Sequence, residues 1–502
     1  MTTFSLSGRL NGLLGRHLPR PSPALPLRQP CLSELAKLPA ARLPLFVRES
    51  EVAMKYLRLL GALDWSRFPD RPDRRFHPDC PSLSYAPVVG AYLVKIDQHL
   101  VYMTDLWEYL IEHPPLVWVL GFPLVPSSAF SWGFDVRASL STHRHLSRLL
   151  RTLPNASPKF LLMNTVQEIQ STLSRVAPNF GDCISLDTKH VIAWVKENNQ
   201  KAYVQGGRYD KTRQPTGDPD CRLGCKRKRN QTKSGQSIED QPTPKTNPVS
   251  ASRLAVGEYY WGYGSGVVAT KVDGWGEFVL AELTQTFDQS DASYFHPLMA
   301  DVERALGRAP RFGALDAAFD SFYVYEYFAK ADGFAAVPLV AHGGHGKRSF
   351  SEDGLPLCAA GLPMPLGSTY ECRTTLVVHE RGRYRCPLRY PEQTTEACPV
   401  DHKNWAKKGC TTTMATSAGA RIRYEIDRDS PEYKNVYRQR TATERVNSQA
   451  VDYGIERPKL RNGVSIANHN TLTYVLINLH ALQRVRQRLA KRPESGSAQE
   501  RA

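Results

Sequence analysis

Three acidic residues lie where their carboxylates could bind metal ions. Asp187 is inside a stretch of β-branched and apolar residues typical of a buried strand, and Asp316 closes a second apolar stretch. Glu444 follows Tyr437 by seven residues and Arg440 by four, a spacing that places these three side chains on one face of a continuous helix. Three carboxylates beside a guanidinium are the groups of a two-metal phosphoryl-transfer site.

The chemistry of such a site assigns a role to each residue. We expect Asp187 to bridge two Mg²⁺ or Mn²⁺ ions, with Asp316 on one ion and Glu444 on the other. Arg440 can bind a phosphate bidentately, and Tyr437 can hydrogen-bond or stack near the end of the bound strand. Taken singly, an aspartate after a strand is usually a turn former, and a helical glutamate is often half of a surface ion pair. Only the combination favours catalysis.

The elements that must position these acids predict an α/β fold. A strand, a hairpin, a helix, a strand, a helix, a strand and then an acid-bearing helix form the element order of the RNase H-like fold. Asp320 falls in the turn after the strand that ends at Asp316. The predicted strands cover 182–196, 259–270, 276–286, 312–316, 335–341 and 421–427, and the predicted helices cover 294–306, 321–331, 431–453 and 468–489.

Changes in composition along the 502 residues predict several domains. An all-helical N-terminal domain with a DNA-binding role precedes the catalytic core, and a mainly β insertion interrupts the core before the last acid. The predicted boundaries are a basic, Pro-rich arm over 1–32, the helical domain over 33–154, the first part of the core over 179–342 with a basic flexible loop at 206–252, the insertion over 343–420, the last part of the core over 421–490, and a tail over 491–502.

The charge of the chain favours an acidic partner. The formal net charge is +16 and the basic residues are spread along the sequence, which indicates nucleic acid, although a merely basic enzyme would share this property. The run Cys221–Lys233 holds six basic residues and no acid. It is either a solvated charge run or a contact to the DNA backbone. We expect its central residues, Lys226, Arg227, Lys228 and Arg229, to bind DNA.

The apolar runs and the cysteines bear on two further properties, membrane association and metal binding. No run approaches the ~18–20 apolar residues that a membrane-spanning helix needs, so no membrane association is expected. Ten cysteines without a secretory signal predict thiols or metal ligands. The quartet Cys372, Cys386, Cys398 and Cys410 is separated by 13, 11 and 11 residues and lacks the close pairs of a zinc ribbon. Buried thiols are therefore favoured over structural zinc.

The acid motifs resemble those of a known family. From about Gly181 to Leu489 the chain resembles the DDE transposases of bacterial insertion sequences, in the superfamily typified by insertion sequence four. The last acid of that family lies in a tyrosine-x2-arginine-x3-glutamate-x6-lysine signature. This chain matches its first three residues but has Val451 in place of the lysine, for which Lys459 or Arg445 could substitute. The run Asp316-Ala-Ala-Phe-Asp-Ser resembles the second-acid motif.

The resemblance implies metal-dependent DNA transposition on an RNase H-like core. It also implies a homodimer acting on double-stranded DNA, both the inverted-repeat ends and the target, in the bacterial cytoplasm and associated with the nucleoid. Two alternatives remain: a metal-dependent nuclease on the same fold that does not rejoin strands, and an inactive, DNA-binding relic of a transposase. Inverted repeats flanking the gene would distinguish the first alternative from a transposase.

Overall fold

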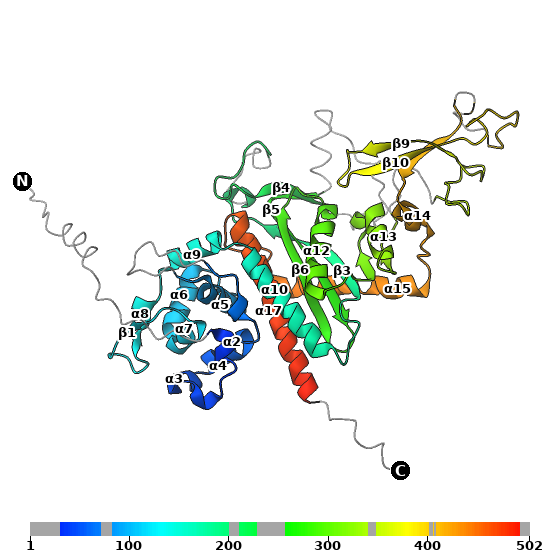
Figure 1. Ribbon diagram of the computed structural model, residues 1–502. Helices are drawn as coiled ribbons and strands as arrows, with labels where there is room; N and C mark the ends of the chain where they lie inside the picture. The colour runs from blue at the N-terminus through cyan, green and yellow to red at the C-terminus, as the bar shows by residue number, and fades with distance from the viewer. Residues whose placement is uncertain are drawn as a thin grey trace, which may run out of the picture. The chain divides into compact units, whose positions relative to one another are not determined.

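The computed structural model describes residues 31–71, 83–199, 210–227, 257–339, 348–400, 405 and 408–491. The chain divides into two compact units, Met1–Leu161 and Leu162–Ala502. The protein is of the mixed α/β class (Figure 1), which confirms the class predicted from the sequence. No helix in the described ranges combines the length and the apolar character needed to cross a membrane.

The first unit is built from short helices around an apolar core, with one antiparallel pair of two-residue strands. Local signals set the helix ends: the Ser50 hydroxyl accepts a hydrogen bond from the Ala53 amide, and Gly121 ends a helix with a φ of 81°. The elements are α2 (Leu32–Leu35), η1 (Ala40–Arg42), α3 (Leu45–Arg48), α4 (Glu51–Leu60), η2 (Trp65–Arg67), α5 (Tyr85–Asp97), α6 (Met103–Glu112), α7 (Pro114–Leu120), β1 (Val125–Pro126), β2 (Phe134–Asp135), α8 (Val136–Ser139) and α9 (His143–Thr152). Helix α10 (Ala156–Leu173) follows.

A mixed sheet organises the second unit. Its strands are β3 (Cys183–Ile192), β4 (Arg222–Arg227), β5 (Gly257–Val272), β6 (Gly276–Thr286), β7 (Phe312–Leu315) and β8 (Phe334–Ala336). Strands β3, β7 and β8 run parallel to one another, whereas β5 pairs antiparallel with β3, β4 and β6. Five of the strands therefore lie in the order β6-β5-β3-β7-β8, and β3 is central.

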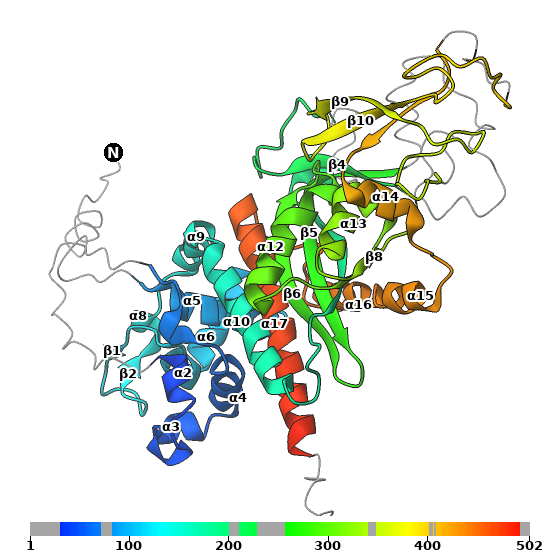
Figure 2. The same ribbon diagram turned by 45° about the vertical axis from the view of Figure 1, so that its right-hand side comes forward.

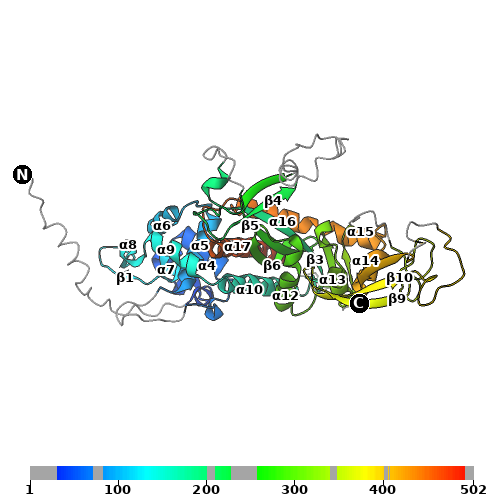
Figure 3. The ribbon, with the colours of Figure 1, turned by 90° about the horizontal axis from the view of Figure 1, so that it is seen from above.

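Helices cover both faces of this sheet. Seen from above (Figure 3), α12 and α13 lie on one side of it and α15 and α16 on the other. The elements outside the sheet are η3 (Lys196–Asn198), η6 (Asp291–Tyr294), α12 (Phe295–Leu306), η7 (Ala317–Phe319), α13 (Phe322–Ala329), α14 (Ala418–Glu425), α15 (Pro431–Arg438), α16 (Thr441–Asp452) and α17 (Gly463–Ala490).

Helix α17 is joined to strand β6 by a side-chain amide. Among the described strands β6 pairs only with β5. The Asn478 amide group donates to the Val279 carbonyl at 2.7 Å, and its oxygen accepts from the Val279 N–H at 2.9 Å. Asn478 is fully buried, so this pair replaces backbone hydrogen bonds that the outer side of β6 would otherwise lack.

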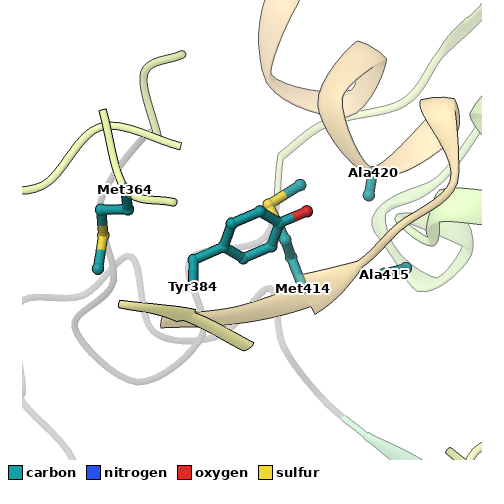
Figure 4. Close-up of a cluster of buried hydrophobic side chains, with 5 residues drawn as sticks. All are labelled: Met364, Tyr384, Met414, Ala415 and Ala420. Carbon is teal, nitrogen blue, oxygen red and sulfur yellow. The ribbon is translucent and has the colours of Figure 1, made fainter. Parts of the chain in front are cut away.

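A three-stranded antiparallel sheet lies in the predicted insertion. It consists of β9 (Leu366–Cys372), β10 (His379–Arg385) and β11 (Thr411–Ala415), in the order β11-β10-β9. In both views (Figures 1 and 2) β10 lies close to α14. A small apolar cluster of Met364, Tyr384, Met414, Ala415 and Ala420 joins this sheet to α14 (Figure 4). Phe322 of α13 packs against this cluster.

The predicted strand over 421–427 is wrong, because residues 421–425 belong to helix α14 and the last two residues are not in a strand. The alternation in Arg421-Ile-Arg-Tyr-Glu matches a strand over only a few residues, and packing decides otherwise. Gly419 lies so close to α13 that a Cβ atom there would be 2.0 Å from the Phe322 carbonyl oxygen. Ala420 also contributes to the apolar cluster.

Eight cysteines are free thiols: Cys31, Cys183, Cys221, Cys358, Cys372, Cys386, Cys398 and Cys410. Three members of the predicted quartet, Cys386, Cys398 and Cys410, line a cavity of about 120 Å³ together with Cys358. Burial raises the pKa of Cys410 to about 12, and the neighbouring Cys386 and Cys358 thiols raise it further. These four cysteines therefore share one small cavity.

Candidate active site

Strand pairing brings the first two acids side by side. In the parallel pair formed by β3 and β7, Leu186 is opposite Leu315. Asp187 and Asp316 come directly after these residues, on neighbouring strands that lie ~4.8 Å apart in a sheet. Asp316 also caps η7, where its side chain accepts a hydrogen bond from the Ala318 amide at 2.8 Å. The two predicted acids are therefore held next to each other by the backbone.

Asp187 has the most perturbed carboxyl group at this site. Burial raises its pKa to about 6, while the Thr188 amide and the Arg440 guanidinium act in the opposite direction. The carboxylates of Asp316 and Asp291 raise the pKa further. Asp187 is therefore a largely buried acid whose negative charge is opposed by two neighbouring negative charges, an arrangement that a bound cation would relieve.

Asp291 is an acid that the sequence analysis missed. It begins η6 and accepts a hydrogen bond from the Thr188 hydroxyl at 2.8 Å. Burial raises its pKa, and the nearby Asp316 carboxylate raises it further. In the sequence it follows Gln289 and Ser290 in an ordinary turn, so no local signal distinguishes it.

Two glycines of β5 allow η6 to approach the sheet. Gly264 and Gly266 point to the same face of the strand. A Cβ atom on Gly266 would be 2.3 Å from the Tyr294 ring, and one on Gly264 would be 2.5 Å from its hydroxyl oxygen. That hydroxyl donates to the Gly264 carbonyl at 3.0 Å. The Gly-Ser-Gly sequence of β5 thus fixes η6, and Asp291 with it, beside β3.

The predicted continuous helix over 431–453 is wrong. Helix α15 ends at Arg438 and α16 begins at Thr441. At the break the Arg440 amide bonds to the Tyr437 carbonyl at 3.0 Å, three residues back, which is a tighter turn than that of an α-helix. Tyr437 therefore lies on a different helix from Glu444, and its ring stacks on Tyr433 with centroids 6.0 Å apart.

Arg440 and Glu444 form an ion pair across the start of α16. An Arg440 Nη1 group donates to Glu444 Oε1 at 2.7 Å, and the glutamate side chain is about half exposed. The buried Nε–H of Arg440 has no hydrogen-bond partner among the described residues. A guanidinium with a spare buried donor beside carboxylates is a suitable anchor for a phosphate.

Asn447 connects α16 to the first acid. It lies one turn after Glu444, and its side-chain amide donates to Asp187 Oδ2 at 3.2 Å. The amide oxygen accepts from the Tyr474 hydroxyl of α17 at 3.4 Å. Because Asn447 and Glu444 are three residues apart on one helix, their side chains share a face. That spacing is a signal from which Asn447 could have been found in the sequence.

Asp320 is a structural residue close to the site. Its side chain is almost fully buried and accepts from the Arg423 Nε and Nη2 groups at 2.6 and 2.5 Å. The Tyr325 hydroxyl also donates to Asp320, at 2.8 Å. This ion pair joins the turn after β7 to α14, so the role of Asp320 is to stabilise the fold.

The predicted DNA-binding run is described only in part. Lys226 and Arg227 are the last residues of β4. Lys228 and Arg229 lie outside the described residues. Of the two residues considered as substitutes for the lysine at position 451, Arg445 forms an ion pair with Glu277 at 2.6 Å. Lys459 instead lies over the Trp194 ring.

The residues present suit a hard cation by their chemistry. As the side chains are placed, no three His, Cys, Asp or Glu residues in the described part of the chain form a group that could hold a metal ion. Glu444 points to Arg440. However, the mutual charge repulsion of Asp187, Asp291 and Asp316 and the oxygen-only donor set match what Mg²⁺ or Mn²⁺ requires.

No protein-family model and no curated protein sequence matches this chain.

Asn447 is expected to tune the acidity of Asp187. Asn447→Ala removes a hydrogen bond to the ionised carboxylate, so the pKa of Asp187 should rise above about 6. A hydrogen bond to a charged group, worth about 1.5 kcal/mol, corresponds to about 1 pH unit. Mn²⁺ binding can be measured by electron paramagnetic resonance while the pH is lowered from 8 to 5. The variant should lose Mn²⁺ at a higher pH than the wild type does, because its Asp187 is protonated earlier.

The matched control for this measurement is Ser448→Ala, an exposed position on the same helix. It should leave the pH dependence unchanged. A loss of Mn²⁺ binding in Asn447→Ala that is equal at every pH would show that Asn447 supports only the fold.

Proposed function

We propose that this protein is a DNA transposase of the DDE type, which cuts DNA strands and transfers them with the help of two Mg²⁺ or Mn²⁺ ions. The observation that carries the proposal is the register of β3 and β7, which sets Asp187 beside Asp316. The strand order β6-β5-β3-β7-β8, with acids on the central strand and after its parallel neighbour, supports an RNase H-like core. Helix α16 supplies Glu444 from beyond the insertion.

In this proposal each residue acts through a contact described above. Asp187, Asp316 and Glu444 would hold the ions, and Asp291 is close enough to contribute a fourth carboxylate. The bound metal would supply the activation of a water or a DNA 3′-hydroxyl and the stabilisation of the leaving oxygen. Arg440 would exchange its contact with Glu444 for one with a DNA phosphate. Asn447 keeps the Asp187 carboxylate oriented.

The partner and the location that we propose follow from the charge of the chain and from its resemblance to the transposase family. The net charge of +16 suits double-stranded DNA, both transposon ends and target. The resemblance to the transposase family implies a homodimer that acts on paired transposon ends. It also implies a location in the bacterial cytoplasm, in association with the nucleoid. The Tyr437, Arg440 and Glu444 motif supports it, although Val451 departs from it.

The test begins with the DNA that flanks the gene. A labelled duplex carrying the flanking repeat should be cleaved at the repeat end in Mg²⁺ and joined to a plasmid, and EDTA should stop both steps. Glu444→Gln should lower both rates by at least about 10³-fold, because it removes a metal ligand without changing shape. Duplex binding, measured in parallel, should remain within a few-fold.

The other outcomes identify the alternatives. Cleavage without joining would indicate a nuclease on the same fold. Duplex binding with neither reaction would indicate an inactive relic. Cleavage by Glu444→Gln at the wild-type rate would remove that residue from the site.

A further inference from the structure

A cavity of about 720 Å³ lies in the second unit, apart from the acids. Two segments line it: residues 192–196, 198 and 199, at and after the end of β3, and residues 457–459 and 461, in the loop between α16 and α17. Backbone contacts hold both walls, since the Ile192 amide donates to the Glu456 carbonyl at 2.8 Å. The Asn198 amide group donates to the carbonyls of Ala193 and Trp261, each at 2.8 Å. The cavity is therefore built on the sheet.

The lining combines an exposed tryptophan with four cations. Trp194 is 40% exposed. Lys459 Nζ lies 5.5 Å and Arg461 Cζ 4.9 Å from the centroid of its ring. Lys196 and Arg457 also line the cavity, and none of the described lining residues is acidic. Two cations over the ring and two more in the lining make this a positive site that an anion would stabilise.

We propose that this cavity binds an unpaired nucleotide of DNA, whose base stacks on Trp194 and whose phosphates contact the surrounding cations. A phosphate alone would need the cations but no exposed aromatic ring. A base inside a duplex has both faces covered by its neighbours, so it cannot stack on a side chain unless it leaves the helix. Aromatic stacking combined with a basic groove is how proteins hold single strands without reading their sequence.

The cavity residues follow β3 and α16, the two elements that carry Asp187 and Glu444. Trp194 is seven residues after Asp187, which corresponds to about 23 Å along an extended chain. A nucleic-acid strand covers this distance with about seven nucleotides at 3.4 Å each. The choice of DNA as the ligand, and the spacing from the cleavage site, rest on the proposed function. The existence of a stacking site at Trp194 does not depend on that function.

The experiment compares single-stranded and duplex DNA in EDTA, so that no cleavage takes place. The probes are a fluorescein-labelled 20-nucleotide oligothymidylate and a mixed-sequence duplex of the same length, followed by fluorescence anisotropy. Trp194→Ala should weaken binding of the single strand by about 5- to 150-fold, the range for loss of one stacked base, and should change duplex binding by less than about 3-fold. Trp194→Phe, which keeps an aromatic face, should retain most of the affinity.

Matched controls separate stacking from charge and from folding. Tyr370 is 41% exposed on β9, so Tyr370→Ala removes an equally exposed aromatic ring and should leave binding of both probes unchanged. Lys459→Ala and Arg461→Ala should each make the salt dependence of single-strand binding shallower by about 0.7 per lost phosphate contact. Thermal unfolding, measured in parallel, should show that Trp194→Ala remains folded at the temperature of the binding measurement.

Three results would overturn the inference: equal single-strand affinity of Trp194→Ala and wild type, an equal loss for single strand and duplex, or no single-strand binding by the wild type. The proposed function is tested by a different result: a protein that does not cleave DNA in the cleavage assay would contradict it. A protein that does not cleave but loses single-strand binding on Trp194→Ala would still have the stacking site.

Discussion

Asp187→Asn is expected to abolish strand cleavage and, in metal-free buffer at neutral pH, to stabilise the folded protein. The amide cannot serve as an anionic metal ligand, so cleavage should fall by at least about 10³-fold. It also cannot ionise. Burial raises the pKa of Asp187 from 3.8 to about 6, so ionising this carboxyl group above pH 6 opposes folding by about 3 kcal/mol.

The pH dependence follows from the direction of the shift. Between about pH 4 and pH 6 the folded state keeps the Asp187 proton while the unfolded state has lost it, so the stability of the wild type falls as the pH rises through this window. Below pH 4 the wild type and the variant should be equally stable, and above pH 6 the variant should have its full advantage. Urea unfolding in EDTA at pH 4, 5.5 and 7 measures this difference.

The control for Asp187→Asn is Glu352→Gln, an exposed acid in the insertion, which should change neither cleavage nor the pH dependence of stability. If Asp187→Asn destabilised the protein at pH 7, a cationic partner would be holding the carboxylate in the folded state. Cleavage near the wild-type rate would remove Asp187 from the catalytic site.

The second large effect concerns Asp320, only four residues after Asp316. Asp320→Ala leaves the Arg423 guanidinium, 17% exposed, without its carboxylate, and it also removes the acceptor of the Tyr325 hydroxyl. Breaking a buried ion pair from one side costs about 3–5 kcal/mol. We expect urea unfolding to show a loss of this size. Asp316→Asn should lose cleavage with less than about 1 kcal/mol change in stability, because an asparagine can still cap η7.

A double variant separates the ion pair from general packing. Asp320→Ala combined with Arg423→Met removes both charges, so it should be more stable than Asp320→Ala alone. If the double variant is as unstable as the sum of the two single variants, the two charges are not coupled, and the contact contributes little beyond shape.

Sequence patterns were sufficient where the relevant interactions are local. The stretch around Asp187 is β-branched and apolar on both sides, as a central strand buried by helices on both faces requires, so the strand and its acid could be predicted. Asp316 follows β7 directly, which the short apolar run before it indicates. That these two residues meet depends on the parallel register of strands more than 100 residues apart, which no local pattern specifies.

The features that were missed depend on tertiary contacts. Asp291 reaches the site because Tyr294 packs against two glycines of β5, and the turn itself contains no sign of this. The break between α15 and α16 has no Pro or Gly to mark it: the interrupting residues are Gln439 and Arg440. Helix α14 forms where five residues alternate like a strand, because packing against α13 overrides propensity.

The Asn478 amide protects the outer side of β6 from pairing with another strand, a protection that the strand order alone would not provide. A sheet edge with free N–H and C=O groups can pair with a strand of another molecule and begin aggregation. Here Val279, in the middle of β6, already has both groups occupied by a side chain of α17. The helix therefore blocks strand addition at Val279, and we expect damage to α17 to appear first as self-association rather than as loss of the sheet.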